Sequence, residues 1–219
     1  MRLLLIRHGQ TPDNVAGALG TTIPGPALTA LGRQQAADLA AAVTEPIAAI
    51  AVSSLIRTHL TAAPLARHRR IDPVEFDGLR EIEAGVYEGR HDPASVTAYL
   101  RTFAAWAAGD LDTRMPDAED GHTFFDRYDT AVAAAIDTTP SSDGTLAIVS
   151  HGAAIRTWVS RRARNIDASF TMDRFLQNTG MVVLEGNPTS SWDLLSWQGE
   201  PVAGAQLADP TAADPVGTL

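Results

Sequence analysis

The sequence of 219 residues contains no cysteine and no lysine. Without cysteine the chain has no disulfide framework and no thiol chemistry, which fits a reducing compartment. Because all 17 basic residues are arginine, Schiff-base catalysis and a P-loop lysine are also excluded. No apolar run approaches the roughly 18 residues that a membrane span requires. We therefore expect a cytoplasmic protein with no membrane partner.

Positive charge is also scarce, since the formal net charge is -9. This balance argues against nucleic acid as the main partner. Hydrophobic residues make up 45% of the chain, which is enough to bury one substantial core. The composition is therefore compatible with a single α/β domain.

Two short apolar runs, residues 3–6 and 146–149, each lead to a His-Gly pair, at His8 and at His151. Such runs, bounded by turn-forming residues, are typical of buried strands in a parallel sheet. Ligands bind beyond the carboxyl ends of these strands. A lone histidine at a strand end is more often a packing residue, so it is the pair that favours a functional site.

Strand and helix patterns alternate along most of the chain and predict an α/β fold, a three-layer α/β/α sandwich with a mostly parallel central sheet and an antiparallel edge strand. The predicted helices are residues 29–43, 55–67, 93–108, 123–136 and 153–164, and the other predicted strands are residues 47–52, 74–76, 181–184 and 192–197, the last two joined by a hairpin at Gly186-Asn187-Pro188.

We expect the domain to span residues 1–198, with a small cap insertion around residues 91–122. Residues 199–219 are rich in proline and alanine and lack periodicity, which predicts a mobile C-terminal tail. Tyr99 and Trp106 share one face of a predicted helix in the cap. That face either docks the helix on the core, which its spacing alone favours, or shapes a pocket for the leaving group.

Two arginines stand near the predicted strand ends. Arg7 precedes His8, and Arg57 follows the second strand, where a solvated helix-face arginine is the alternative. In a parallel sheet both arginines would converge with His8 and His151 on one edge. Such a cationic cluster is costly unless it meets an anion, and guanidinium groups bind phosphate in bidentate fashion.

Five blocks of sequence, in collinear order over most of residues 1–185, resemble the histidine phosphatase superfamily, the cofactor-dependent phosphoglycerate mutase-like proteins. The blocks are Leu5-Ile6-Arg7-His8-Gly9-Gln10-Thr11 with Asn14, Leu28-Thr29-Ala30-Leu31-Gly32-Arg33 with residues 34–36, Ser54-Leu55-Ile56-Arg57-Thr58 with residues 61–62, Leu79-Arg80-Glu81-Ile82-Glu83-Ala84-Gly85 with residues 86–89, and Val149-Ser150-His151-Gly152.

The resemblance implies that His8 is a nucleophile that forms a phosphohistidine, which water then hydrolyses. Glu81 matches the proton donor to the leaving oxygen, with Glu83 and Glu88 as competing carboxylates. Arginines supply the positive charge in the transition state, so no metal and no other cofactor is expected. The implied catalytic residues are His8, Glu81, His151, Arg7 and Arg57, and the implied substrate-binding residues are Arg7, Asn14, Arg57, His151, Gly152 and Gln10.

The sequence departs from the family pattern at three places. Gln10 stands where a glutamate is frequent, and residues 26–28 replace an Asp-x-Pro-Leu block. Residues 120–123 stand where a Gly-Glu-Ser-like element is common, so His122 either replaces a carboxylate near the substrate or caps a helix. These departures bear on the identity of the substrate and not on the phosphoryl chemistry.

In the family that the sequence resembles, mutases carry a longer insertion between the Glu81 region and the second histidine. The compact insertion here therefore implies a phosphatase for small-molecule phosphate monoesters rather than a mutase. A cofactor-dependent phosphoglycerate mutase and a catalytically silent protein that binds a phosphorylated ligand are the alternatives. A hydrolytic zinc site at His8, His151, Glu81 and Asp13 is a further one, although the adjacent arginines would repel the metal. Whether the chain forms a homodimer is left open.

Overall fold

A six-stranded sheet in the order β3-β2-β4-β1-β5-β6 forms the centre of the protein, in a computed structural model that describes residues 1–141, 144–187 and 191–217. The parallel strands are β1 (Arg2–Arg7), β2 (Ala49–Val52), β3 (Val74–Glu75) and β4 (Thr145–Ser150). At one edge, β5 (Met181–Asn187) pairs antiparallel with β1, and β6 (Ser191–Gln198) pairs antiparallel with β5.

The apolar residues of β1 divide between two cores because successive side chains of a strand point to opposite faces. Leu3 and Leu5 belong to one buried cluster, and Leu4 and Ile6 belong to the other. All four side chains are fully buried. A continuous apolar run is therefore what a strand covered on both faces requires.

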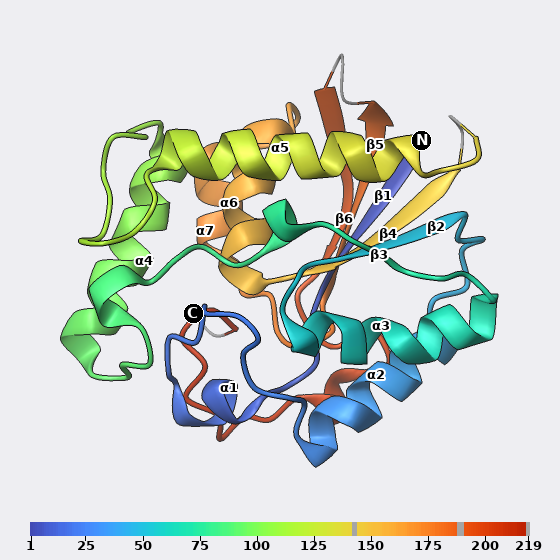
Figure 1. The fold of residues 1–219 in the computed structure, drawn as a ribbon, viewed down its shortest axis with the longest axis horizontal. Helices are drawn as coiled ribbons and strands as arrows, with labels where there is room; N and C mark the ends of the chain where they lie inside the picture. Colours follow the sequence, from blue (N-terminus) through green and yellow to red (C-terminus); the bar gives the residue numbers. More distant parts are fainter. Residues whose placement is uncertain (142–143, 188–190, 218–219) are drawn as a thin grey trace.

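Helices cover both faces of this sheet (Figure 1). On one face lie α2 (Ala30–Ala42) and α3 (Ile56–Arg69). On the other lie α4 (Pro93–Ala108), α5 (Gly121–Asp137) and α6 (Gly152–Arg162). The predicted three-layer α/β/α sandwich is confirmed. No helix in the described part of the chain has the length and apolar character that a membrane crossing requires.

Short helices lie in the connections between these elements. They are α1 (Pro12–Ala16), α7 (Ala168–Met172) and three 3₁₀ segments at Asp77–Leu79, Gly85–Tyr87 and Ala205–Leu207. Pro12 occupies the first turn of α1, where a missing N–H does no harm. The sequence did not predict α7, because five residues are too few to show helical periodicity.

Local capping explains where the main helices begin. The Thr29 hydroxyl accepts a hydrogen bond from Gly32 N at 3.0 Å and starts α2. The carboxylate of Asp120 accepts one from Thr123 N at 2.8 Å and starts α5. His122 is therefore not the cap. Its side chain is 63% exposed, with Nε2 3.2 Å from the carboxylate of Asp112.

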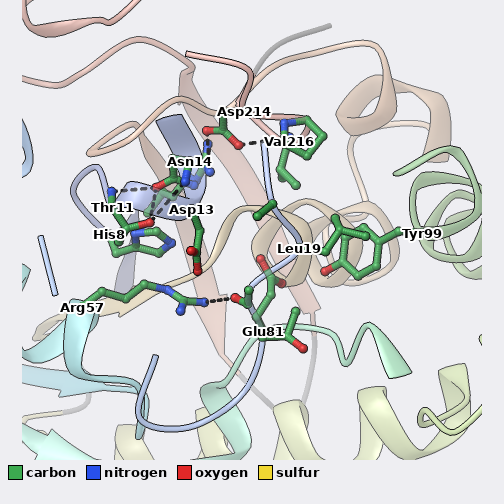
Figure 2. A pocket seen from close by; sticks show the side chains of 15 residues that line it. His8, Thr11, Asp13, Asn14, Leu19, Arg57, Glu81, Tyr99, Asp214 and Val216 are labelled. Carbon is green, nitrogen blue, oxygen red and sulfur yellow. Dashed lines mark hydrogen bonds and ion pairs between the residues drawn. The ribbon is translucent and has the colours of Figure 1, made fainter. Parts of the chain in front are cut away.

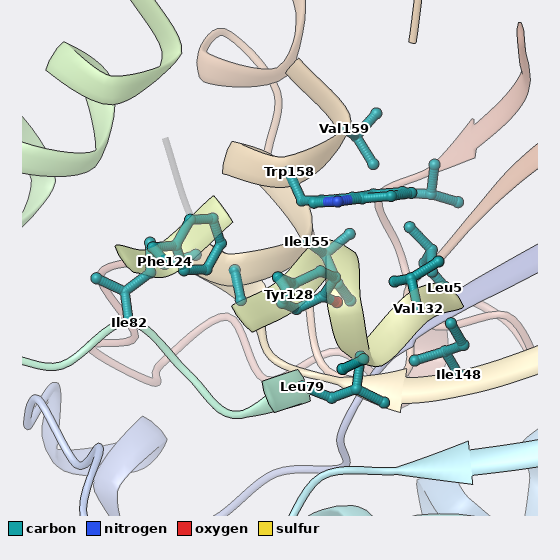
Figure 3. Packing of buried hydrophobic residues seen from close by; sticks show 14 of the residues in the cluster. Leu5, Leu79, Ile82, Phe124, Tyr128, Val132, Ile148, Ile155, Trp158 and Val159 are labelled. Carbon is teal, nitrogen blue, oxygen red and sulfur yellow. The ribbon is translucent and has the colours of Figure 1, made fainter. Parts of the chain in front are cut away.

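The aromatic residues of the cap helix dock it on the core. Tyr99 and Phe103 of α4 are each 2% exposed, and Trp106 is fully buried and stacked on Phe124 of α5 with ring centroids 5.5 Å apart. Figure 3 shows the continuation of this cluster from Phe124 through Tyr128 to Trp158 of α6. The packing function that the spacing favours is the one observed.

The end of the chain differs from the expectation of a mobile tail. Residues 199–217, here called the C-terminal segment, pack along the domain, with Leu207 8% exposed and Val216 7% exposed. Ala213 N donates to Val15 O at 3.2 Å, and Gln35 Nε2 donates to Leu207 O at 2.8 Å. Single contacts of this kind leave no periodic pattern in the sequence. Residues 218 and 219, and the predicted hairpin turn at Pro188, lie outside the described residues.

We expect Leu207→Ala to lower the free energy of unfolding by about 2–3 kcal/mol, because a buried leucine side chain is removed. The matched control is Leu195→Ala on β6, which is 48% exposed and is expected to change stability by less than about 0.5 kcal/mol. Urea unfolding measures both. Equal small effects would show that the C-terminal segment does not pack against the domain.

Candidate active site

The carboxyl ends of the parallel strands meet at a cavity of about 30 Å³. Arg7 and His8 reach it from the end of β1, Arg57 from the first turn of α3, and Glu81 from the connection after β3 (Figure 2). His151 follows β4 and is fully buried, with its ring centroid 5.3 Å from that of His8. The structure thus brings the five predicted catalytic residues together.

The turn after β1 is held by close contact with two helices. Gly9 N donates to the hydroxyl of Thr61 on α3 at 2.9 Å. A Cβ atom at Gly9 would lie 2.6 Å from the carbonyl oxygen of Gly32 on α2, so only glycine allows this approach. These contacts fix the backbone on which His8 stands.

A single hydrogen bond sets the tautomer of His8. Nδ1 lies 2.8 Å from the carbonyl oxygen of Gly9, which can only accept, so Nδ1 carries the proton and Nε2 keeps its lone pair. Burial lowers the pKa of His8 well below its ordinary value, and the positive charges of Arg57 and Arg7 lower it further. His8 is therefore neutral and nucleophilic at Nε2.

His151 has the opposite tautomer. Arg57 Nε donates to Nδ1 at 3.2 Å, so Nε2 carries the proton and donates to Ser53 Oγ at 2.7 Å. Burial lowers the pKa of His151 well below its ordinary value, with Arg57 as the next cause. Sequence reasoning missed Ser53, whose one signal is a hydroxyl placed directly after a buried strand.

Two arginines carry the positive charge of the site, and hydrogen bonds and an ion pair hold their side chains in place. Arg7 donates to Leu176 O at 2.7 Å and forms an ion pair with Asp214 at 2.7 Å. Its buried Nε has no hydrogen-bond partner among the described residues. Arg57 also donates to Gly20 O at 3.1 Å. Burial lowers the pKa of Arg57 to about 10, so it remains cationic at neutral pH.

Glu81 lies at the amino terminus of α6. Its carboxylate accepts hydrogen bonds from Ala154 N at 2.8 Å, Ala153 N at 3.2 Å and Ile82 N at 2.9 Å. Burial raises the pKa of Glu81, and these N–H donors together with Arg57 oppose the rise. A carboxyl group with a raised pKa beside an arginine is suited to exchange a proton with a bound ligand.

The two competing carboxylates hold loops instead. Glu83 pairs with Arg80 at 3.1 Å. Glu88 accepts hydrogen bonds from the backbone and hydroxyl groups of Thr21 and Thr22. Neither is among the described residues that line the cavity. Of the three candidates, Glu81 is the one in the site.

Of the remaining predicted substrate-binding residues, Asn14 lines the cavity and Gln10 does not. Gln10 Nε2 donates to Asp209 at 2.9 Å, and its oxygen accepts from the Thr29 hydroxyl at 2.8 Å, so it fastens the C-terminal segment. Gly152 lies against Arg7, since a Cβ atom there would be 3.0 Å from Arg7 Nε. Gln10, predicted to bind substrate, therefore lies outside the described lining of the cavity.

Three lining residues, Asp214, Pro215 and Val216, come from the C-terminal segment. Sequence reasoning missed them because this stretch carries neither periodicity nor a motif. Asp13, considered above as a zinc ligand, also lines the cavity. Within the described residues no group of three or more His, Asp or Glu side chains is arranged to hold a metal ion, and the ring nitrogens of His151 already have partners.

Fold and site together define a class of protein. It is an α/β sandwich with two buried arginines beside a neutral histidine at the carboxyl edge of its sheet, an arrangement suited to an oxyanion. A family model described as "Histidine phosphatase superfamily (branch 1)" matches residues 3–199. The chain belongs to this superfamily, as the five sequence blocks indicated.

Three proteins illustrate what the chain is similar to. The PE-PGRS family protein PE_PGRS11 of Mycobacterium tuberculosis is 39% identical over 223 residues, which cover 94% of this chain but 38% of that protein. "Probable phosphoglycerate mutase GpmB" of Citrobacter koseri is 34% identical, over 73% of this chain and 74% of its own length. A mycobacterial glucosyl-3-phosphoglycerate phosphatase, solved as a VO3 complex, is 25% identical with a TM-score of 0.75, covering 91% of this chain and 99% of that one.

We expect the free energy of unfolding to fall as the pH falls below the ordinary histidine pKa of 6.5. Both buried histidines stay neutral in the folded protein, so the unfolded chain binds more protons and is favoured by acid. The raised pKa of Glu81 acts in the opposite direction, above the ordinary carboxyl pKa of 4.5.

His151→Gln removes one of the two groups and should make this pH dependence shallower, by up to about 1.4 kcal/mol per pH unit. Urea unfolding at pH 7.5, 6.5 and 5.5 measures the slope. His91→Gln, at an exposed position, is the control and should keep the wild-type slope. Parallel slopes for His151→Gln and the wild type would contradict the neutral, buried state of His151.

Proposed function

We propose that this protein is a phosphatase that hydrolyses small-molecule phosphate monoesters through a phosphohistidine on His8. One observation carries the proposal: the Gly9 carbonyl accepts the Nδ1 proton of His8, so that Nε2 is unprotonated in a cavity that two arginines also line. A buried neutral histidine between guanidinium groups suits nucleophilic attack on phosphorus.

In the first step, the lone pair of His8 Nε2 forms a bond to phosphorus, and the bond from phosphorus to the ester oxygen breaks. Arg7 and Arg57 offset the charge on the phosphoryl oxygens as the transition state forms. Glu81 gives its proton to the leaving oxygen, so that a neutral alcohol departs.

In the second step, water attacks the phosphohistidine. Glu81, now a carboxylate, accepts a proton from the water as its oxygen bonds to phosphorus and the bond to Nε2 breaks. The products are inorganic phosphate and neutral His8. The backbone N–H groups of Ala153 and Ala154 stabilise the anionic form of Glu81 between the two steps.

The cations of the cavity favour a phosphatase over a mutase. Among the described lining residues these are Arg7 and Arg57, and both serve the transferred phosphoryl group. A bisphosphorylated intermediate would bring a second phosphate, for which the lining holds no further arginine. A mutase is therefore an outcome of the test below and not the conclusion.

The proposal concerns esters of small molecules, since the net charge of -9 disfavours nucleic acid. A cytoplasmic location is part of the proposal. Because the chain spans 38% of the length of its Mycobacterium tuberculosis relative, the activity of any longer protein is likewise a matter of proposal.

The test is hydrolysis of an aryl phosphate by the wild type and by His8→Ala, in the presence of a chelator. We expect chelator-resistant turnover that the variant loses, and a phosphoenzyme that survives a base quench and is lost in acid. A phosphoenzyme formed only from a bisphosphorylated sugar acid would establish the mutase. No turnover and no phosphoenzyme would favour a silent binding protein.

Glu81→Gln should lose about 10²–10⁴-fold in kcat on an alkyl phosphate, whose leaving group needs a proton. On 4-nitrophenyl phosphate the loss should be much smaller, because that leaving group departs as an anion. Comparison of the two losses separates proton donation from a structural effect, which would lower both equally. Glu83→Gln is the matched control, and both activities should stay near those of the wild type.

A further inference from the structure

The C-terminal segment brings a carboxylate to the edge of the phosphoryl site. Asp214 is 5% exposed, and its Oδ2 lies 2.7 Å from NH2 of Arg7. Its Oδ1 accepts a hydrogen bond from Val216 N at 3.3 Å, which helps to fix the orientation of the carboxylate. The carbonyl of Val216 is in turn held by Arg156 NH1 at 3.2 Å. The negative charge of Asp214 is therefore held in a fixed position beside Arg7.

The position of this carboxylate is not what packing alone would favour. Burying an ion pair is expensive, because both charges lose their hydration. Arg7 already has a second acceptor in Leu176 O. A negative charge beside a site for anions therefore affects which substrates can bind there, according to the charge that they carry.

The charges that line the cavity can be divided between the two halves of a substrate. A bound phosphoryl group takes Arg7 and Arg57. The leaving group then meets the carboxylates of Asp214 and Asp13. The side chains of Leu19, Tyr99 and Val216 line the same space. In the view of Figure 2, Asp214 and Val216 lie on one side of this space and Arg57 and Glu81 on the other.

Resting on the proposed function, we propose that Asp214 is a specificity-determining residue, which selects uncharged or cationic leaving groups over leaving groups that carry a negative charge. Its effect is electrostatic repulsion in a poorly solvated space, where a single charge is screened weakly. Phosphate esters of simple alcohols and phenols fit this rule. Esters whose alcohol carries a carboxylate, such as phosphoglycerates, are disfavoured.

The experiment compares phenyl phosphate with 4-carboxyphenyl phosphate, which differ by one carboxylate and little in the acidity of the leaving phenol. The wild type should favour phenyl phosphate in kcat/KM by about tenfold or more. Asp214→Asn keeps the shape and an acceptor for Arg7 but removes the charge, and it should reduce this preference about tenfold.

Two variants separate charge from packing. Asp209→Asn weakens another contact of the same segment, the hydrogen bond from Gln10 at 2.9 Å, outside the cavity lining, and should keep the wild-type preference. Asp214→Glu keeps the charge and should keep most of the preference. Equal loss of preference in Asp209→Asn and Asp214→Asn would mean that loosening of the segment, and not charge, is responsible, which would overturn the inference.

A third substrate, 4-(aminomethyl)phenyl phosphate, tests the idea on the wild type alone, even where Asp214→Asn does not fold. The kcat/KM for this substrate, whose leaving group is cationic, should be at least as high as that for phenyl phosphate. The kcat/KM for 4-carboxyphenyl phosphate should be the lowest of the three. The reverse order would overturn the inference. If the wild type hydrolyses all three substrates and Asp214→Asn keeps the same ratios of kcat/KM between them, the inference is wrong and the proposed phosphatase activity is supported. If the wild type hydrolyses none, the proposed function fails and the inference with it.

Discussion

The burial of two arginine side chains at the carboxyl edge of the sheet is the constraint on which the rest of the structure depends. Arg7 is 2% exposed and Arg57 is 3% exposed, so each charge needs acceptors drawn from distant parts of the chain. Leu176 O and Asp214 serve Arg7, while Gly20 O and His151 serve Arg57. These contacts tie the loop after β1, the connection before β5 and the end of the chain to one site.

The same arginines decide the state of the histidines. Their positive charge, added to burial, keeps both rings neutral, and fixed partners then give them opposite tautomers. His8 keeps an unprotonated Nε2, whereas both nitrogens of His151 are engaged in hydrogen bonds. Two neighbouring residues of one chemical type thus have different protonated nitrogens because their hydrogen-bond partners differ.

The C-terminal segment links stability to the site. Its residues Leu207 and Val216 are buried against the domain, and between them Asp209 and Asp214 contact Gln10 and Arg7. A segment that packs and also lines the cavity can shape the space for a leaving group while the central machinery stays unchanged. Under the two proposals made above, the chemistry would come from the strand ends and the selectivity from the C-terminal segment.

The sequence by itself determined the sheet, the layers and the central machinery. Apolar runs before His8 and His151 require buried parallel strands, and such strands end on one edge, so the convergence of Arg7, Arg57 and both histidines follows from local pattern. Only the tertiary structure decided the roles of Ser53, Gln10 and Asp214. Each acts through a partner at least 98 positions away in the chain, and no local pattern records a contact of that range.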